Sequence, residues 1–443
     1  MVISHLVAPA TLPNLPNSLS VLSYNVLLPN SVDAWWTYKM YAPPLSEANR
    51  HVAAWSHRRD LLKNRIGLVN ADVVCLQEVS PESFEEDFSF MAELGYDGCE
   101  LFKKGRFRPA TFWKESKCTL VTPAAHKDRT LLTAFKLKYQ EEDEQLGTWF
   151  VLNCHLQAGK EGRRRFRQIQ EGTKAIISMA NKLKVKDPAS RVKAIICGDF
   201  NGGAECGAVR YLEDGFVDAD FLEDGEQVSS NRKDLLIKPS LRDVMSCAGH
   251  TPPPTMVVAE LISQLVQDSG SSYENPVLSD GVVDRLKRIY ESKATLLCGH
   301  EMCMSRQDVE AWLMDINGRV GRGDEFREAA RQMGWKPPQE GMSADEIKEI
   351  ISLPSEGILT LEGFIAVYQR ELTGGKFWSI NHDLSILGEP LENLGLFTAR
   401  YDRMYCTGAV KPAVILDFHS DKPCPNADEP SDHLPVAACF LAS

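Results

Sequence analysis

The alternation of apolar and polar positions predicts strands at both ends of the chain. Runs with period-two alternation, rich in β-branched or aromatic residues, are typical of strands. The expected strands span residues 20–28, 71–78, 111–121, 131–139, 148–154, 194–197, 399–406 and 436–441. Helical spacing instead marks residues 58–69 and 163–183, with Ile169, Ala175 and Met179 facing inward on the second helix.

A different pattern fills the long interval between the two groups of strands. From about Cys247 the chain passes Thr251-Pro-Pro-Pro254 and then helical segments rich in Glu, Lys and Arg as far as Leu372. We therefore expect a lead-in over residues 1–18, a two-part domain over 19–246 and 393–443, and an all-α domain inserted at 247–392. Because strands and helices mix without strict βαβ repetition, the two-part domain is predicted to be an α+β sandwich.

The overall charge narrows the classes of partner. The chain has 49 basic and 61 acidic residues, for a net charge of −12, which argues against a broad electrostatic grip on duplex nucleic acid or anionic membrane. A polyanionic substrate would need local basic patches, and residues 103–108 and 163–167 offer two, although either is equally well a solvated face.

The cysteines and the apolar runs bear on the compartment. Twelve cysteines are scattered and several stand in apolar runs, which is typical of a reducing compartment. No apolar stretch is long enough to span a bilayer, so no membrane partner is expected. We expect an intracellular protein, cytoplasmic or nuclear, and an organellar address stays open.

Polar residues suited to phosphate chemistry recur in separate short segments. Each is weak alone, because an Asp-x-Asn is usually a turn and a histidine near proline is usually at the surface. Together they supply the groups needed for metal-assisted cleavage of a phosphate ester. The segments are Tyr24-Asn25-Val26, Leu76-Gln77-Glu78-Val79, His155, Gly198-Asp199-Phe200-Asn201 and Ser431-Asp432-His433.

Each candidate has an expected role. Glu78 at a strand end is the best ligand for Mg²⁺, or alternatively Mn²⁺, with Asn25 supporting the ion directly or through water. Asp199 with Asn201 suits alignment of the attacking water, while His155 and His433 suit the phosphoryl oxygens. Asp402, an acid on a predicted strand, is expected to orient His433.

At these residues the chain resembles a known superfamily. The segments at residues 22–27, 72–79, 153–156, 198–201 and 431–435 are similar to the five signatures of the endonuclease/exonuclease/phosphatase superfamily, in family order. The resemblance implies a four-layer α/β/β/α sandwich and Mg²⁺-dependent phosphoester hydrolysis. It also implies that Asn25, Glu78 and Asp432 lie around the metal, and that Asp402 partners the final histidine.

Within the superfamily the chain resembles the carbon-catabolite-repressor, nocturnin and angel branch of RNA 3′-exonucleases. Residues 24–27, the aromatic stretch at 35–38 and the segments at 95–98 and 207–212 carry this likeness, while residues 107–110 and 202–204 depart from the deadenylase pattern. The stretches at 129–132 and 155–159 are closer to tyrosyl-DNA phosphodiesterases. We expect a deadenylase-like hydrolase of single-stranded RNA, with Arg108, Arg163 and Arg164 near the substrate backbone. The alternatives are a phosphatase or DNA-adduct phosphodiesterase, or a calcium-responsive adaptor.

The inserted domain resembles a pair of degenerate EF-hands. Residues 358–364 are similar to the β-segment and exiting helix of one hand, and residues 304–309 to the same part of another. A calcium loop ends on a bidentate Glu, yet Gly363 or Phe326 stands at the twelfth position of the two conceivable loops. Strong Ca²⁺ binding is therefore not favoured. A docking or partner-binding module and a plain packing module are equally expected.

Overall fold

The computed structural model describes residues 4–8, 10–32, 34–102, 105–138, 147–228, 237–238, 240–249, 251–267 and 275–442. Lys103 and Lys104 of the first basic patch, and Tyr139 of a predicted strand, lie outside these residues. Backbone contacts divide the chain into two compact units. We call residues 1–37, 50–258 and 398–443 the sandwich unit, and residues 38–49 and 259–397 the helical unit.

Two mixed seven-stranded sheets form the centre of the sandwich unit. The first has the order β1-β19-β20-β2-β3-β5-β4, with β2 and β3 parallel. Its strands are β1 (Ser4–Val7), β2 (Ser18–Asn25), β3 (Val73–Val79), β4 (Gly98–Leu101), β5 (Arg108–Trp113), β19 (Val410–Asp417) and β20 (Val436–Ala442).

The second sheet has the order β13-β18-β10-β9-β8-β6, with β7 also paired to β8. Its strands are β6 (Cys118–Leu120), β7 (Ala125–Lys127), β8 (Thr130–Leu137), β9 (Trp149–His155), β10 (Lys193–Asp199), β13 (Arg242–Asp243) and β18 (Asp402–Cys406). Strands β9 and β10 run parallel, whereas β18 is antiparallel to β10.

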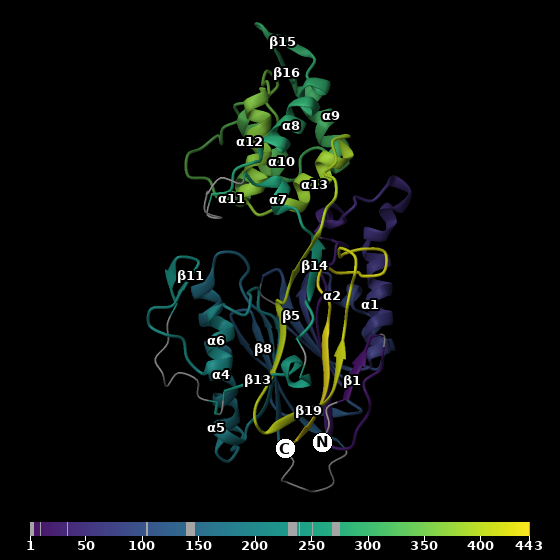
Figure 1. Cartoon of the computed structure of the whole chain (residues 1–443), viewed down its shortest axis with the longest axis vertical. Coiled ribbons are helices and arrows are strands. Elements are labelled where there is room, and N and C mark those ends of the chain that lie inside the picture. The colour runs from purple at the N-terminus through teal and green to yellow at the C-terminus, as the bar shows by residue number, and fades with distance from the viewer. Residues whose placement is uncertain are drawn as a thin grey trace. The chain divides into compact units, whose positions relative to one another are not determined.

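Three clusters of buried apolar side chains pack the two sheets against each other and against the helices. Between the sheets, Val21 and Val73 of the first meet Val151 and Ile195 of the second. Helix α1 (Trp55–Val69) packs Leu62 and Ile66 on the outer face of the first sheet, while α4 (Gly162–Lys182) covers the second with a cluster that includes Ile169 and Met179. Figure 1 shows α1 on one side of the sheets and α4, α5 (Pro188–Arg191) and α6 (Gly207–Asp214) on the other, which is an α/β/β/α arrangement.

Short elements complete the sandwich unit. They are η1 (Trp35–Met40, which continues into the helical unit), η2 (Glu47–Ala53), α2 (Phe84–Asp87), α3 (Phe90–Glu93), β11 (Leu222–Glu223), β12 (Glu226–Gln227), η4 (Met245–Ala248) and β14 (Met256–Ala259). None of the helices in the described part of the chain is long and apolar enough to cross a membrane.

Most predicted elements appear in the structure, with one clear error. The single strand expected over 111–121 is wrong, because a turn at residues 115–117 separates β5 from β6. There the Lys117 N–H donates to the Lys114 carbonyl at 2.9 Å, which closes the turn. The pattern also missed β19, whose buried apolar run holds Pro412 at a bulge.

The helical unit has its own core around Trp312, Phe364 and Tyr368. Its elements are α7 (Ile262–Leu265), α8 (Asp280–Lys293), α9 (Arg306–Asn317), α10 (Asp324–Gln332), α11 (Ala344–Ile350), α12 (Leu361–Thr373), α13 (Phe377–Ile386), β15 (Leu296–Cys298), β16 (Glu301–Cys303) and β17 (Leu396–Ala399). The β15–β16 hairpin means that the insert is mainly helical rather than all-α. Lys39 is buried in this unit, 2.7 Å from Glu325 and 2.9 Å from Asp383.

Candidate active site

The polar residues singled out in the sequence meet at one edge of the sandwich unit. On the second sheet β9 ends at His155, β10 ends at Asp199 and β18 begins at Asp402, and backbone pairing sets these three residues in register. On the first sheet β2 ends at Asn25, which is in register with Gln77 of β3. The second sheet thus presents two acids and an imidazole at adjacent strand ends, and the first sheet presents two amides.

A glycine makes room for the acid that ends β10. A Cβ on Gly198 would lie 1.9 Å from the Cys154 carbonyl oxygen, and the residue has φ +137°. Only glycine accommodates both the close approach of β9 and that backbone angle. The packing of β9 against β10 therefore requires a glycine at the position before Asp199.

Glu78 lies where β3 leaves regular pairing. Its φ is 62°, and the register with β5 shifts between Leu76 and Val79. The irregular backbone lets the carboxylate accept from the Leu28 N–H at 3.2 Å and from Asn25 Nδ2 at 3.4 Å. Burial, with Asp432 adding to it, raises the pKa of Glu78 to about 7.

Asp199 is held from both of its carboxylate oxygens. Its Oδ2 accepts from Asn25 Nδ2 at 3.0 Å and from Asn201 Nδ2 at 3.1 Å, while Oδ1 accepts from the Asn201 N–H at 2.7 Å. Asn25 is fully buried and its Oδ1 accepts from the Leu27 N–H at 3.1 Å. The two amides therefore fix the direction of the acid.

His155 is buried between two acids and an arginine. Its Nδ1 donates to the Phe107 carbonyl at 2.7 Å, while Nε2 lies 3.7 Å from Glu78 Oε1 and 3.8 Å from Asp199 Oδ2. Burial lowers the pKa of His155 to about 4, against the opposing effect of Asp199 and with a further lowering by Arg129. The imidazole is therefore neutral near pH 7, and its Nε2 faces the acids.

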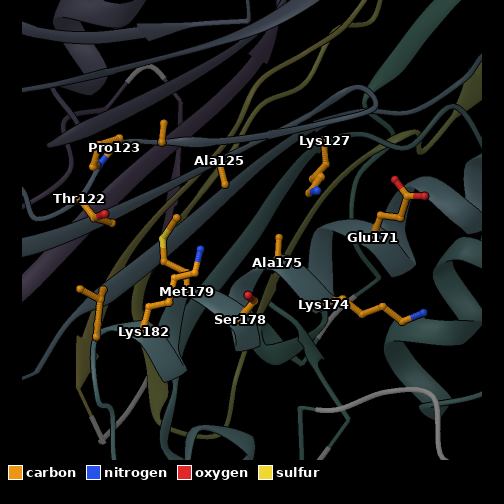
Figure 2. Close-up of a pocket in the computed structure, with 12 residues that line it drawn as sticks. Thr122, Pro123, Ala125, Lys127, Glu171, Lys174, Ala175, Ser178, Met179 and Lys182 are labelled. Atoms are coloured by element: carbon orange, nitrogen blue, oxygen red, sulfur yellow. The ribbon is translucent and has the colours of Figure 1, made fainter.

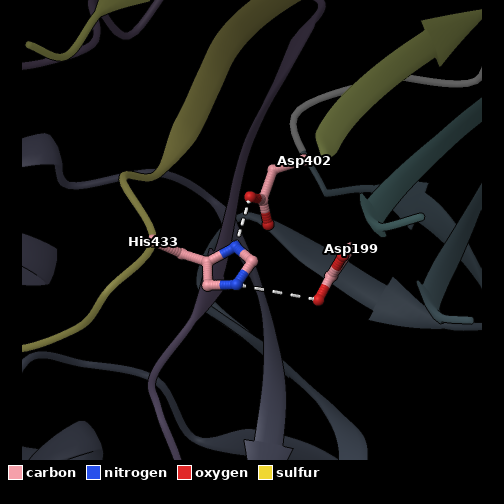
Figure 3. Close-up of side chains that lie close together, drawn as sticks. All are labelled: Asp199, Asp402 and His433. Carbon is pink, nitrogen blue, oxygen red and sulfur yellow. Dashed lines mark hydrogen bonds and ion pairs between the residues drawn. The ribbon is translucent and has the colours of Figure 1, made fainter. Parts of the chain in front are cut away.

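His433 has the opposite electrostatics. Its Nδ1 lies 2.6 Å from Asp402 Oδ2 and its Nε2 lies 4.0 Å from Asp199 Oδ2, as Figure 3 shows. Burial alone would lower the pKa of His433. The nearby carboxylates of Asp402, then Asp432 and Asp199, outweigh burial and raise that pKa well above its usual value. The site thus holds one neutral and one charged imidazole.

Asp432 and His433 are placed by a buried serine. Ser431 Oγ donates to the Asn25 carbonyl at 2.7 Å and accepts from the His433 N–H at 3.2 Å. This bond ties the C-terminal loop to the end of β2 across the sequence. Asp432 is buried and lies close enough to Glu78 for their charges to interact.

Two positioning residues were missed as such in the sequence. Arg58 of α1 is fully buried and donates to the carbonyls of Pro430 (2.7 Å), Val26 (2.6 Å) and Leu27, so it joins the loops that follow Asn25 and precede Ser431. Thr255 Oγ1 accepts from the N–H groups of Tyr401 and Asp402 at 3.1 and 2.9 Å. The sequence could have indicated the role of Arg58, because an arginine stands there among apolar helix positions. No sequence pattern indicates the role of Thr255.

The arginines predicted near the substrate, Arg108, Arg163 and Arg164, differ in their contacts, and Arg129, which was not predicted, also lies beside the site. Arg129, between β7 and β8, interacts with Arg108, Arg164 and Glu78, and burial with the two neighbouring arginines lowers its pKa. Arg108 stacks on Phe102 at 5.2 Å, and Arg164 Nε lies 3.7 Å from Asp128. Arg163 is exposed on the first turn of α4.

The donor set fits a hard divalent cation. Asp199, Asp402 and His433 offer ligand atoms that all lie within 4.8 Å of one another and could hold a metal ion. A ligating histidine must be neutral, however, whereas His433 is paired with Asp402 and has a raised pKa. The carboxylates of Glu78 and Asp432, which crowd one another, match the oxygen ligands that Mg²⁺ prefers.

Comparison with known proteins places the chain in a family. The Endonuclease/Exonuclease/phosphatase family model matches residues 22–433. The CCR4-Not complex 3′-5′-exoribonuclease subunit Ccr4 of Schizosaccharomyces pombe is 26% identical over 249 residues, which are 45% of this chain and 35% of that protein. Protein angel homolog 2 of Danio rerio is 24% identical over 228 residues, which are 48% of this chain and 38% of that protein.

The match to these curated relatives is partial, since it spans only 35% and 38% of their length. Among solved structures, a crystal structure of ANGEL2, described as a 2′,3′-cyclic phosphatase in complex with adenosine-2′,3′-vanadate, is 18% identical with a TM-score of 0.49, covering 96% of this chain and 97% of that one. The family match spans most of this chain and includes each segment that supplies the site. The chain therefore belongs to the Endonuclease/Exonuclease/phosphatase family of metal-dependent phosphoester hydrolases, as its motifs predicted.

Proposed function

We propose that the protein is a Mg²⁺-dependent phosphodiesterase that hydrolyses single-stranded RNA from its 3′ end. The observation that carries the proposal is the convergence of Asp199, His155 and the His433–Asp402 pair beside the crowded acids Glu78 and Asp432. This set offers a base, phosphate-binding imidazoles and oxygen ligands at one point.

The roles follow from charge and hydrogen bonding. Asp199, held by two amides, takes the proton of the attacking water, and Asn201 keeps its carboxylate in that orientation. His433 is cationic and, aligned by Asp402, donates to a phosphoryl oxygen. His155 becomes a second donor once a phosphate lies beside it, because that negative charge favours the protonated imidazole.

Glu78 and Asp432 would hold the cation, and Asn25 positions both Glu78 and Asp199 through its amide nitrogen. Mg²⁺, when bound, supplies positive charge against the charge that develops on the phosphate. Mn²⁺ would satisfy the same oxygen donors.

A nucleic acid substrate is supported by the relatives and by the arginines. The Schizosaccharomyces pombe relative is named as a 3′-5′-exoribonuclease. Arg108, Arg129 and Arg164 interact with one another at the edge of the site, although like charges repel, and such a cluster favours a polyanion. Arg163, exposed on the first turn of α4, would extend this cluster.

A side-by-side assay separates the substrates. Poly(A), mixed-sequence RNA, a 5′-tyrosyl DNA adduct and small phosphate esters would be offered with Mg²⁺, and products resolved by length. The proposal expects stepwise shortening of RNA from the 3′ end. Cleavage of the adduct or esters in preference to RNA would overturn the RNA assignment and leave the hydrolytic chemistry standing.

We also propose that the helical unit is a pair of EF-hand-like modules. Helices α8 and α9 flank the β15–β16 hairpin, and α10 and α12 flank a longer segment that contains α11. The two segments pair through an antiparallel bridge between Met304 and Leu359. Among the described residues of this unit, no three His, Cys, Asp or Glu side chains gather to hold an ion. In this proposal the unit binds a partner helix rather than Ca²⁺. Calorimetry with Ca²⁺ tests this, and a strong binding heat would contradict the proposal.

A further inference from the structure

A basic depression lies between α4 and the strand segment that contains β7. Its volume is about 710 Å³. Figure 2 shows Thr122, Pro123, Ala125 and Lys127 lining it on the strand side, opposite the α4 face that includes Glu171, Ala175 and Met179. Three lysines surround it: Lys127 from β7, and Lys174 and Lys182 from α4. The roles proposed above use none of them.

The charge of this depression is not neutralised. Among the described residues, Lys127, Lys174 and Lys182 form no ion pair, and Glu171 is the single acid in the lining. In a chain with net charge −12, three unpaired cations around one hollow are a local exception. Ala125, Ala175 and Met179 supply an apolar floor beneath them. Lysines grouped around one hollow suit the phosphates of a single strand.

The depression is continuous in the chain with the active site. Lys127 stands two residues before Arg129, whose carbonyl accepts from the His155 N–H at 3.0 Å. Asp128, between them, meets Arg164 at 3.7 Å and Arg167 at 3.4 Å on the first turns of α4. Further along that helix come Lys174 and then Lys182. Basic side chains thus lead from beside His155 along α4 to the depression.

We propose that this depression, which we call the α4 groove, binds the backbone of single-stranded RNA several nucleotides away from the scissile bond. The inference rests on the proposed function and deepens it, because it makes a chain of several nucleotides the preferred substrate. Lys127, Lys174 and Lys182 contact phosphates there without touching the reacting atoms. The groove therefore contributes to binding of long substrates and leaves the chemical step on short ones unchanged.

The test compares a triple variant, Lys127→Ala with Lys174→Ala and Lys182→Ala, against a matched control that removes Lys186, Lys411 and Lys422. All three control lysines are exposed and lie outside the groove. Each variant is assayed with Mg²⁺ on a 20-nucleotide unstructured RNA and on a dinucleotide, over a series of salt concentrations. The triple variant should lose about tenfold in kcat/KM on the 20-mer, through KM, and stay within twofold of the parent on the dinucleotide.

Salt dependence gives a second reading. Each phosphate contact on a single strand contributes roughly 0.7 to the slope of log affinity against log salt, so losing three should lower the slope by about 2. The proposed role of the groove would be contradicted by a salt slope that is the same in the triple variant and the parent. It would also be contradicted by an equal loss of kcat/KM on both RNAs, or by an equal loss in the control variant. If the parent cleaves neither RNA, the proposed function fails. Anisotropy of a labelled 20-mer on parent and triple variant then still reports on the groove, and equal binding by the two would overturn it.

Discussion

His433 Nδ1 lies 2.6 Å from Asp402 Oδ2, a contact between the first residue of β18 and the loop that leads into β20. The acid is 1% exposed, and its other oxygen, Oδ1, has no hydrogen-bond partner among the described residues. A buried carboxylate in this position is costly unless it faces a cation. The pair therefore fixes both the orientation and the positive charge of His433.

Replacing Asp402 with Asn should lower kcat by about 100-fold, a loss typical of general acid–base and orienting groups. The pKa of His433 is raised chiefly by Asp402, so the charged form persists to higher pH in the parent. Without the carboxylate the pKa of His433 falls. As the pH rises, the variant should therefore lose activity at a lower pH than the parent does. A pH series of kcat measures both effects, and an unchanged alkaline limb would contradict the assigned role.

Thr255→Val should reduce kcat with little change in KM. The hydroxyl accepts from the backbone N–H groups of Tyr401 and Asp402, and valine leaves both donors unsatisfied at the start of β18. Asp402 then loses its fixed position beside His433. Steady-state kinetics measure the split; Thr255→Ser, which keeps the acceptor, should retain most activity, and a loss equal to that of the valine variant would count against this account.

Arg58→Ala should destabilise the sandwich unit by about 3 kcal/mol, because several buried carbonyls lose a charged donor. The same change frees the loops that hold Asn25 and Ser431, so the Mg²⁺ concentration for half-maximal activity should rise. Urea unfolding and Mg²⁺ titration measure the two effects. Arg59→Ala, next along the helix, is the control and should change neither.

Glu371→Gln should flatten the pH dependence of stability in the helical unit. Burial, then Glu325, raises the pKa of Glu371 to about 8, with Asp383 adding to this and Lys39 opposing it; Lys376 Nζ lies 3.5 Å away. The folded state thus binds more protons than the unfolded chain between about pH 4.5 and 8, and stability falls as pH rises through that window.

The parent should therefore lose stability more steeply than the Gln variant, by about 1 kcal/mol per pH unit within the window. Urea unfolding followed by tryptophan fluorescence measures the difference, with Trp312, which is fully buried in the same unit, among the eight tryptophans that report on it. If the free energy of unfolding changed with pH in parallel for the two proteins, Glu371 would be ionised in the folded state and the account would be contradicted.

The sequence was most informative where chemistry and periodicity coincide. The long amphipathic pattern near residues 163–183 predicted α4 almost to its ends. The Asp-x-Asn and Asp-His segments named residues that the fold brings together at the candidate site. Family signatures supplied the four layers and the order of the motifs.

Other features depend on contacts that no local pattern shows. Pro412 interrupts the pattern of β19, and the turn at 115–117 is too polar and short to distinguish from a strand bend. Thr255 and Arg58 act through backbone groups far away in sequence. Burial lowers the pKa of His155, whereas the acids around His433 raise its pKa despite burial, and neither environment is visible in the local sequence.

The most direct test is Mg²⁺-dependent hydrolysis of an unstructured RNA by the parent and by Glu78→Gln, which keeps the shape of the side chain and removes its charge. We predict that the parent shortens the RNA from its 3′ end only with Mg²⁺ or Mn²⁺. The variant, once circular dichroism has shown that it is folded, should lose at least about 100-fold in rate. Metal-dependent turnover retained by Glu78→Gln would contradict the account.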